Sequence, residues 1–257
     1  MFNRRKHIGL DSGFNSSPLA QRRTSGGSTP VYHLSSALHE WYYKNSTVVG
    51  TTVTSVDTGS VGGMNMANPD VSSEPIVNID NIQFDGVSQY QIKNIANFRG
   101  ADTTGCVHMK FIPTDNTFNQ VNYFFTSADI GSLSLVGFAY VNLKIRINIR
   151  TSSLVLILDT VNAMTINTIN TVSIFSNGTT IKLYLNGVLQ TLTVVNGTTN
   201  DGRWFNFSPD RDNLAIGALI TTSNVFGKLK NIYESYTPYI NDSTVLLEHN
   251  DIRLNAI

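Results

Sequence analysis

The sequence has few of the residues that several common functions need. Its 257 residues include a single cysteine, Cys106, which excludes an intrachain disulfide and a cysteine-rich metal site. Only 14% of the residues are charged, against about 25% in an average soluble domain. Formal net charge is zero, so the chain as a whole does not attract nucleic acid or an anionic membrane, and we expect no nucleic-acid partner.

Long apolar runs are also absent. No apolar stretch reaches the roughly 18 residues that a membrane-spanning helix needs. The basic N-terminus is not followed by an apolar segment of signal-peptide length. We therefore expect a protein made in a cytoplasm, with no signal peptide and no membrane span. Hydrophobic residues still make up 41% of the chain, which is enough to bury a substantial core.

Strict alternation of apolar and polar residues is the strongest structural signal. In the segment 143–150, "LKIRINIR", residues at odd positions are apolar and residues at even positions are polar, which predicts a half-buried strand. The segment 181–185 alternates in the same way between Asn177-Gly178 and Asn186-Gly187. Asn-Gly favours two-residue type I′ turns, so we predict an antiparallel meander, with a further strand and reversal at Asn196-Gly197.

Other segments complete an all-β interpretation. A hairpin is predicted around Asp85-Gly86, and the region 31–44 fits either a helical turn or a first strand. The segment 241–254 predicts the one convincing helix, with Asp242 or Ser243 as its N-cap. The predicted fold class is an antiparallel β-sandwich with an extended N-terminal arm, residues 1–30, a domain over residues 31–257 and a short C-terminal helix.

Four segments, in the same order, resemble concanavalin A-like, laminin G-type jelly-roll domains. They are "IQFDGVSQYQI", "SIFSNGTTIKLYLNGVLQ", "NLAIGALITTSNVFGKLKNIYES" and "NDSTVLL". The family often has Trp-His where Asn170-Thr171 stands here, which affects the subfamily but not the fold. The matched residues have structural roles in the family, in turns and in aromatic packing; they are Phe84, Asp85, Gly86, Tyr184, Asn186, Gly187, Gly217 and Gly227.

The first 30 residues combine Gly, Ser and Pro with two basic clusters, Arg4-Arg5-Lys6 and Arg22-Arg23. Such a segment cannot bury itself, so we interpret these cations as docking residues for other proteins; a solubilising tail is the alternative. The layout of a basic arm before a jelly roll resembles bacteriophage virion components. It implies a location in the virion, virion proteins as partners and a homo-oligomeric assembly.

Catalytic patterns are weak. Glycosidases on this fold need two carboxylates on one strand, and the Glu-x-Asp-x-Glu pattern is absent, so we predict that the chain is not an enzyme. Cys106 and His108 share one face of a strand, but no orienting acid lies near them in sequence. No cofactor motif is present. Asp210, Asp212 and Asn213 form a calcium candidate, although such a run is more often a solvated turn.

Two surfaces are candidates for glycan or partner binding. One is the outward row Lys144, Arg146 and Arg150, which could instead be a solvated strand face. The other is the loop with Arg203 and Trp204, where a tryptophan could stack on a sugar or close the end of the sandwich. The predicted function is a non-enzymatic structural or adhesive component of a phage particle, which could bind a cell-surface glycan. The alternative is a soluble carbohydrate-binding lectin module, and a glycan hydrolase ranks third.

Overall fold

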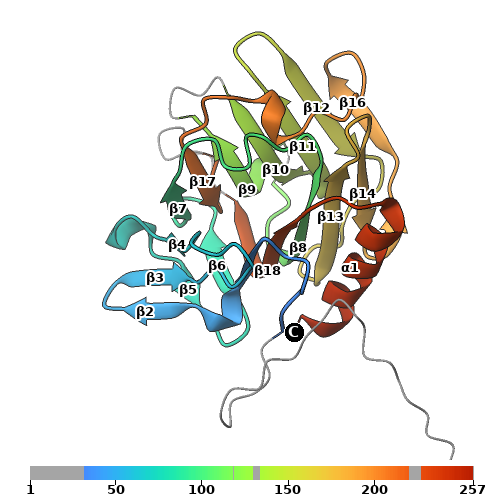
Figure 1. The fold of residues 1–257 in the computed structure, drawn as a ribbon. Helices are drawn as coiled ribbons and strands as arrows, with labels where there is room; N and C mark the ends of the chain where they lie inside the picture. Colours follow the sequence, from blue (N-terminus) through green and yellow to red (C-terminus); the bar gives the residue numbers. More distant parts are fainter. Residues whose placement is uncertain (1–31, 118, 130–133, 220–226, 257) are drawn as a thin grey trace, which may run out of the picture.

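Two antiparallel β-sheets pack face to face as a sandwich, which confirms the predicted fold class (Figure 1). The structure is a computed structural model that describes residues 32–117, 119–129, 134–219 and 227–256. Within these residues, no helix is both long and apolar enough to span a membrane.

The first sheet has eight strands, with β8 and β18 at its centre. Its strands, in spatial order, are β15 (Val188–Leu189), β14 (Ile181–Leu185), β13 (Asn170–Ser176), β8 (Gly105–Pro113), β18 (Lys228–Thr237), β6 (Ile82–Asp85) and β5 (Ile76–Val77), and β1 (His39–Tyr42) also pairs with β18.

The second sheet has ten strands and faces the first. Its strands, in spatial order, are β16 (Leu192–Asn196), β12 (Val155–Thr160), β11 (Lys144–Arg150), β10 (Leu135–Val141), β9 (Val121–Ala128), β17 (Asn213–Ile216), β7 (Gln91–Asn94), β4 (Met66–Ala67), β3 (Thr52–Ser55) and β2 (Thr47–Val49).

Helix α1 (Asp242–Asn255) lies against β13 and β8, on the outer face of the first sheet (Figure 1). Its N-cap is Asn241, whose side-chain oxygen accepts a hydrogen bond from the backbone N–H of Thr244 at 2.9 Å. The prediction of Asp242 or Ser243 as the cap was therefore wrong, because Asn241 is the residue placed to reach this N–H. Short 3-10 helices are η1 (Tyr43–Asn45), η2 (Val71–Ser73) and η3 (Phe205–Phe207).

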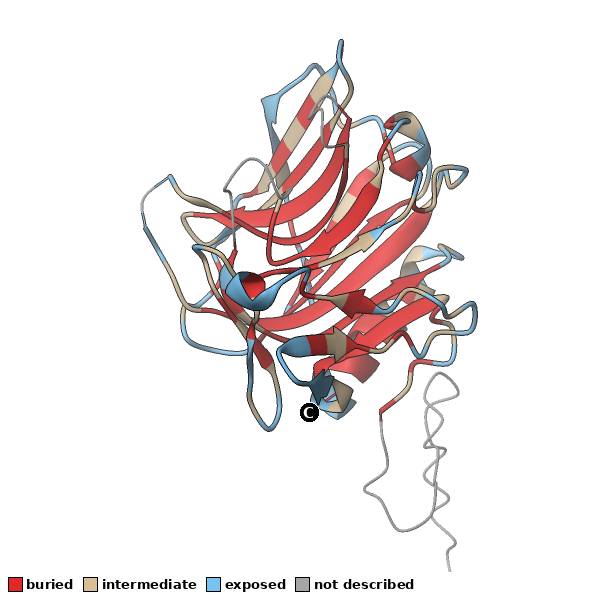
Figure 2. Cartoon of the chain, turned by 90° about the vertical axis from the view of Figure 1, so that its left-hand side faces the viewer, coloured by how far each residue is buried: buried red, intermediate tan, exposed pale blue. Residues whose placement is uncertain are grey.

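The hydrophobic core fills the space between the sheets, and Figure 2 shows buried residues along the central strands of both layers. The alternation predicted for 143–150 holds in β11, where Ile145, Ile147 and Ile149 are fully buried. Leu143 is an exception. It lies with Asn142 in the turn between β10 and β11, where both residues have positive φ, 62° and 51°.

The Asn-Gly signals have different outcomes. Asn186 and Gly187 have φ of 51° and 89° and join β14 to β15 as the predicted two-residue turn. Asn177-Gly178 instead begins a longer loop, because the next paired residue after Ser176 is Ile181. There the Asn177 side chain accepts hydrogen bonds from the N–H groups of Thr179 and Thr180 at 3.0 and 2.8 Å, an arrangement that stabilises a wider turn.

Two predicted hairpins are crossovers between the layers. β6 and β7 flank the turn at Asp85-Gly86, yet β6 belongs to the first sheet and β7 to the second. Likewise the meander ends at β15, and the chain joins the second sheet as β16; the pair Asn196-Gly197 follows that strand and does not join two paired strands. Turn residues determine where the chain bends, whereas packing between layers determines which strand pairs with which.

Gly217 allows close packing between two of the segments that resemble the jelly-roll family. It has a φ of 78°, and a Cβ at this position would lie 2.7 Å from the Phe84 ring. A side chain here would displace that ring, because real Cβ atoms are not found so close to other atoms. The Phe-Asp-Gly turn and the later Ile-Gly segment therefore meet in the core.

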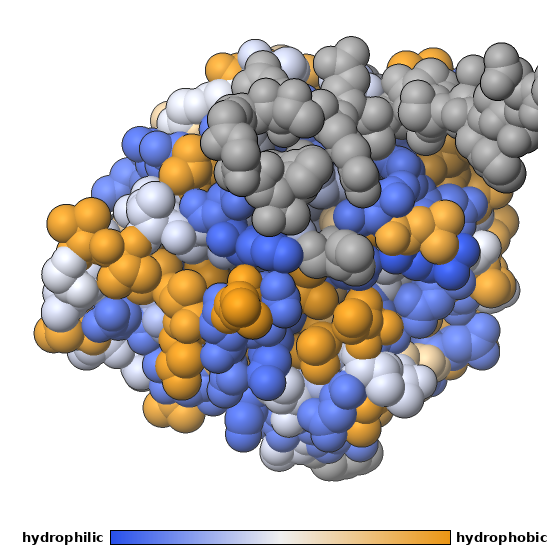
Figure 3. All heavy atoms as spheres, turned by 90° about the horizontal axis from the view of Figure 1, so that it is seen from below, coloured by the Kyte–Doolittle hydropathy of each residue, from blue (hydrophilic) through white to orange (hydrophobic). Residues whose placement is uncertain are grey.

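The face of the molecule seen from below carries separate groups of apolar side chains among polar ones (Figure 3). Exposed apolar residues include Val48 and Val49 of the edge strand β2 and Ile76 and Val77 of the edge strand β5. Isolated apolar residues of this kind are normal on a protein surface. The homo-oligomeric assembly stays a prediction, because the structure contains one chain.

Candidate functional site

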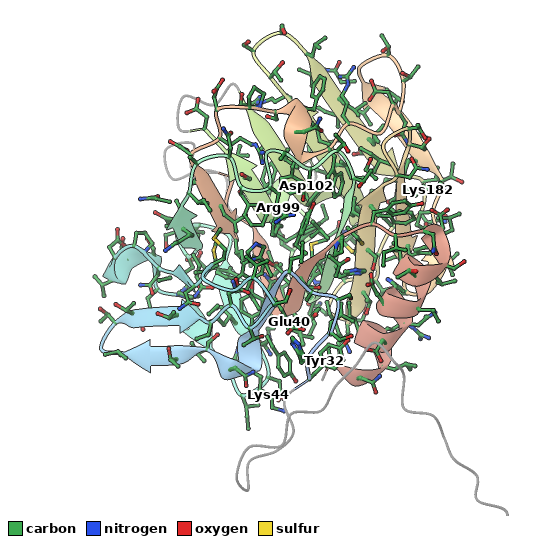
Figure 4. The ribbon with its side chains drawn as sticks, viewed as in Figure 1. Tyr32, Glu40, Lys44, Arg99, Asp102 and Lys182 are labelled. Atoms are coloured by element: carbon green, nitrogen blue, oxygen red, sulfur yellow. The ribbon has the colours of Figure 1, made fainter. Side chains whose placement is uncertain are left out.

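An open pocket of about 540 Å³ lies beside the loop that joins β7 to β8, where the chain crosses from the second sheet to the first. Arg99 and Asp102 of this loop lie close together, and both are partly exposed (Figure 4). The pocket volume is in the range of small-molecule sites, about 300–1,000 Å³. The lining residues are His39, Val61, Met64, Ile95, Asn97, Phe98, Arg99, Gly100, Ala101 and Asp102.

The loop holds an unusual backbone conformation. Asn97 and Arg99 have φ of 47° and 54°, a region that residues other than glycine seldom adopt and that costs of order 1–3 kcal/mol each. Arg211 fixes the first of them: the Asn97 N–H donates to its carbonyl at 2.6 Å, and the Asn97 side-chain oxygen accepts from its N–H at 3.0 Å. Strain that is held in place in this way is common at functional sites.

The Arg99 side chain is anchored by Asp102 and Tyr236. Its Nε donates to Asp102 Oδ2 at 2.7 Å, and the Tyr236 hydroxyl donates to the same oxygen at 2.6 Å. The guanidinium carbon lies 5.1 Å from the centroid of the Tyr236 ring. Burial lowers the pKa of Arg99, but the hydrogen bond and charge of Asp102 raise that pKa more, so the group stays cationic.

The Arg99 side chain is 26% exposed, and within the described part of the chain its guanidinium pairs only with Asp102 and the Tyr236 hydroxyl. A guanidinium fork of this kind donates two parallel hydrogen bonds to a carboxylate, or single bonds to hydroxyl oxygens. The pocket therefore offers fixed, cationic donors to a ligand.

His39, which also lines the pocket, pairs with the buried Asp57 behind it. His39 Nδ1 lies 2.8 Å from Asp57 Oδ2, and the same carboxylate accepts the backbone N–H groups of Glu40, Gly59 and Met64 at 2.9, 3.0 and 3.1 Å. Burial raises the pKa of Asp57, but the hydrogen bonds from His39, Glu40 and Gly59 outweigh it, so the pKa falls below its ordinary value. Asp57 is therefore a fixed anion.

The structure contradicts Trp204 as a sugar platform. Trp204 is fully buried, its ring centroid is 5.8 Å from that of Phe138, and its Nε1 donates to the Tyr236 hydroxyl at 3.3 Å. The ring fills the end of the core between the sheets, so neither of its faces is open to a sugar. Its neighbour Arg203 lies outside the core, paired with Asp201 at 2.8 Å and 4.4 Å above the Phe207 ring.

The predicted row on β11 is only partly available. Lys144 is exposed, but Arg146 makes a two-bond ion pair with Asp159 on the neighbouring strand, at 2.8 and 2.7 Å, and this hydrogen bonding raises the pKa of Arg146. Arg150 is half-buried. The row lies on the outer face of the second sheet, apart from Trp204 between the sheets, so the two predicted binding surfaces do not form one site.

The calcium candidate does not converge on a cation. Asn213 directs its amide nitrogen, not its oxygen, at Asp212 Oδ1, 2.9 Å away, whereas calcium takes oxygen ligands. Asp210 is exposed. In the residues that the structure describes, no group of three or more His, Cys, Asp or Glu side chains could hold a metal.

Two further predictions concern Cys106 and the basic arm. Burial raises the pKa of the Cys106 thiol well above its usual value, so the thiol stays protonated and is a poor nucleophile. The docking residues Arg4, Arg5, Lys6, Arg22 and Arg23 lie outside the described residues. The arm, its partners and the location in the virion stay predictions.

Sequence reasoning missed the pocket residues Arg99, Asp102 and His39, and also Asp57, which pairs with His39. The first two stand three residues apart in a polar loop between strands, which is a signal for a turn and not for a ligand. His39 and Asp57 are separated by 18 positions. Only the pairing of β1 with β18 and the crossing loop bring the four together.

No protein-family model matches the sequence, and neither does any curated protein. Among solved structures, the fold is similar to the CBM40 module of the Ruminococcus gnavus IT-sialidase bound to α2,3-sialyllactose, with 14% identity, a TM-score of 0.52 and coverage of 66% of this chain and 96% of the module. It is also similar to Trypanosoma rangeli sialidase, with 10% identity, a TM-score of 0.61 and coverage of 93% of this chain and 37% of the sialidase. A leech intramolecular trans-sialidase matches over 66% of this chain and 27% of its own length, with 14% identity and a TM-score of 0.52.

These matches establish a shared jelly-roll fold, in agreement with the concanavalin A-like resemblance. The chain spans nearly all of the binding module but only about a third of the sialidases. The prediction that the chain is not an enzyme was wrong, because it depended only on the absence of one carboxylate pattern. The similar structures include enzymes, the sialidases.

Proposed function

We propose that the protein binds glycans and that the pocket beside Arg99 is the binding site. One observation carries the proposal: a jelly-roll fold that spans nearly all of a CBM40 module holds an open pocket lined by a partly exposed, cationic guanidinium. Glycan binding was the alternative to the virion interpretation.

The lining of the pocket suits a sugar. The terminal nitrogens of Arg99 can donate to a carboxylate or to hydroxyl oxygens, and these donors are already oriented by Asp102 and Tyr236. Val61, Met64 and Ala101 give the apolar contacts that the C–H faces of a sugar ring need. Pre-orientation of the donors lowers the entropy lost on binding.

The test is a glycan array followed by titration calorimetry. Sialyllactoses are the first probes, because the similar CBM40 module binds them. Wild-type protein should bind at least one glycan, and Arg99→Met should weaken that binding about tenfold or more, which corresponds to about 1.4 kcal/mol. Absence of binding across the array would remove the proposal.

Arg203→Met is a matched control. Arg203, like Arg99, is paired with a nearby aspartate and lies over an aromatic ring, but it does not line the pocket. It should leave the affinity unchanged; equal losses in both variants would point to a nonspecific charge effect. A fluorogenic sialoside assayed with the same samples reports whether bound glycan is also cleaved.

A virion role is a separate prediction that glycan binding leaves open. A particle protein with a glycan pocket would attach to cells, with the arm docked on another virion protein. Deletion of residues 1–30 should then prevent incorporation into particles and leave glycan binding intact. Normal incorporation of the shortened chain would contradict the docking role of the arm.

A further inference from the structure

The hydrogen bond from His39 to Asp57 determines which ring nitrogen of His39 carries the proton. Asp57 is ionised and can only accept hydrogen bonds, so the 2.8 Å contact requires a proton on His39 Nδ1. In the neutral imidazole, Nε2 then carries the lone pair and is an acceptor. No described residue donates a hydrogen bond to this atom.

The ring of His39 is held in one orientation. One face stacks on Trp41 at a centroid distance of 6.1 Å and an interplanar angle of 15°, and Phe98 packs against it at 5.3 Å. The residue is only 2% exposed, yet it lines the pocket. Because the ring faces and the Nδ1 edge are covered, the remaining edge, with Nε2, is the part that borders the pocket.

His39 Nε2 has no protein donor, but the atom is accessible from the pocket. A small donor in the pocket, water or a ligand hydroxyl, can therefore satisfy it. His249, by contrast, has contacts to both ring nitrogens, from Gly187 N–H and to Ser173. The unpaired Nε2 of His39 therefore marks a position at the pocket where a ligand hydroxyl can donate in place of water.

We propose that the pocket takes a hydroxylated acid, with its anionic group on Arg99 and a hydroxyl group donating to His39 Nε2. The ligand class is a sugar acid. This inference rests on the proposed glycan binding and deepens it, because it adds a second contact point of opposite hydrogen-bonding character.

The two contact points determine how the ligand is oriented. A carboxylate accepts hydrogen bonds only, so it cannot pair with the lone pair of His39 Nε2 and must bind at Arg99. A hydroxyl can donate, so it satisfies His39. Asp102 and Asp57, the carboxylates that pair with Arg99 and His39, are both occupied by protein donors and do not compete for these roles.

The test uses methyl glycosides of three sugar acids, a hexuronic acid, a 3-deoxy-octulosonic acid and a 3-deoxy-nonulosonic acid, each with its uncharged carboxamide. Wild-type protein should bind at least one acid about tenfold or more tightly than the matching carboxamide. If no acid is preferred over its carboxamide, the inference is wrong. Neutral glycans that bind in an Arg99-dependent way would still leave the proposed function standing.

Two substitutions separate the acceptor from the fold. His39→Asn keeps an N–H where Nδ1 stands, and so keeps the bond to Asp57, but it removes the Nε2 acceptor; it should weaken acid binding about tenfold. His39→Gln returns an acceptor oxygen near the Nε2 position and should stay within about threefold of wild type. Wild-type affinity in His39→Asn would overturn the inference.

A second measurement uses wild-type protein and does not depend on whether a variant folds. In a nitrogen NMR spectrum, His39 Nε2 should have the shift of an unprotonated imidazole nitrogen, and this resonance should move when the preferred acid is added. The signal is assigned by its absence from His39→Gln. A resonance that stays unchanged at saturation contradicts the contact.

Discussion

Two buried histidine clusters, one beneath α1 and one beside the pocket, differ in how completely their ring nitrogens are paired. Beneath α1, the Gly187 N–H donates to His249 Nε2 at 2.8 Å, which leaves the proton on Nδ1 to donate to Ser173 Oγ at 2.8 Å. The Ser173 hydroxyl then donates to His108 Nδ1 at 2.7 Å, and His108 Nε2 donates to Glu248 at 3.1 Å. Every member has a defined donor or acceptor role.

The Ser-His-Glu order of this cluster is that of a hydrolase triad, yet its geometry serves the fold. Ser173, His108 and Glu248 are fully buried under the helix, so no substrate reaches the hydroxyl. The pocket cluster is the reverse, since His39 keeps one nitrogen free at an open cavity. Of two polar clusters with similar burial, the incompletely paired one is the candidate for binding.

The largest expected effect comes from breaking the paired cluster. Glu248→Leu leaves His108 and the hydroxyls of Ser36 and Thr237 without their acceptor, and should lower the free energy of unfolding by about 3–5 kcal/mol. Equilibrium urea unfolding measures it. Glu248→Gln, which keeps an acceptor oxygen, is the control and should cost clearly less; equal, small costs in both variants would show that the cluster does not stabilise the fold.

Acid should destabilise the protein through the same cluster. Burial, with the positive charge of Arg253, lowers the pKa of His249 from 6.5 to about 3. Between these values the unfolded chain binds a proton that the folded chain does not, so stability falls as pH drops from 6.5 to 3, by up to about 4 kcal/mol.

Glu248 acts in the same direction at lower pH. Burial raises its pKa, but the hydrogen bonds from His108, Ser36 and Thr237 lower it more, so protonation below pH 4.5 costs further stability. Urea unfolding from about pH 7 to about pH 4 measures the slope. His249→Gln should flatten the slope, and an unchanged slope in that variant would assign it to other groups.

The same substitution at two histidines sharpens the comparison. His249→Asn and His39→Asn both delete an Nε2 and part of a ring, but only the first leaves a buried N–H, that of Gly187, without an acceptor. We expect His249→Asn to cost about 1–3 kcal/mol more than His39→Asn in urea unfolding. Equal costs would mean that the unpaired Nε2 of His39 has a protein partner.

The smallest effect is expected at the surface. Lys182 and Asp242 form a 2.5 Å ion pair between β14 and the start of α1, but their side chains are 33% and 39% exposed. Lys182→Ala should cost at most about 1 kcal/mol, and the cost should decrease with added salt. A cost as large as that of Glu248→Leu would contradict the view that burial determines the strength of these contacts.

Local signals in the sequence predicted local structure well. The alternation of Ile145, Ile147 and Ile149 gave a correctly buried strand face, and Asn186-Gly187 gave a correct two-residue turn. The predicted pairing failed where the chain changes layer, as at Asp85-Gly86. A turn dipeptide acts on a few neighbouring residues, whereas sheet membership depends on contacts between residues far apart in sequence.

Single residues could not be assigned to surface or core by type alone. Trp204, a candidate sugar platform, is part of the core, while Arg99, in a loop without a motif, borders the pocket. An aromatic ring suits either place, so its burial depends on what packs around it.

By itself the sequence determined many of the strands, the two-residue turn at Asn186-Gly187 and the C-terminal helix, because period-two hydrophobicity, turn residues and capping residues act over short distances. The tertiary structure alone decided the pocket. Whether a histidine nitrogen is paired or open depends on partners such as Asp57 and Gly187, which are distant in sequence and are brought to it only when the two layers and α1 pack together.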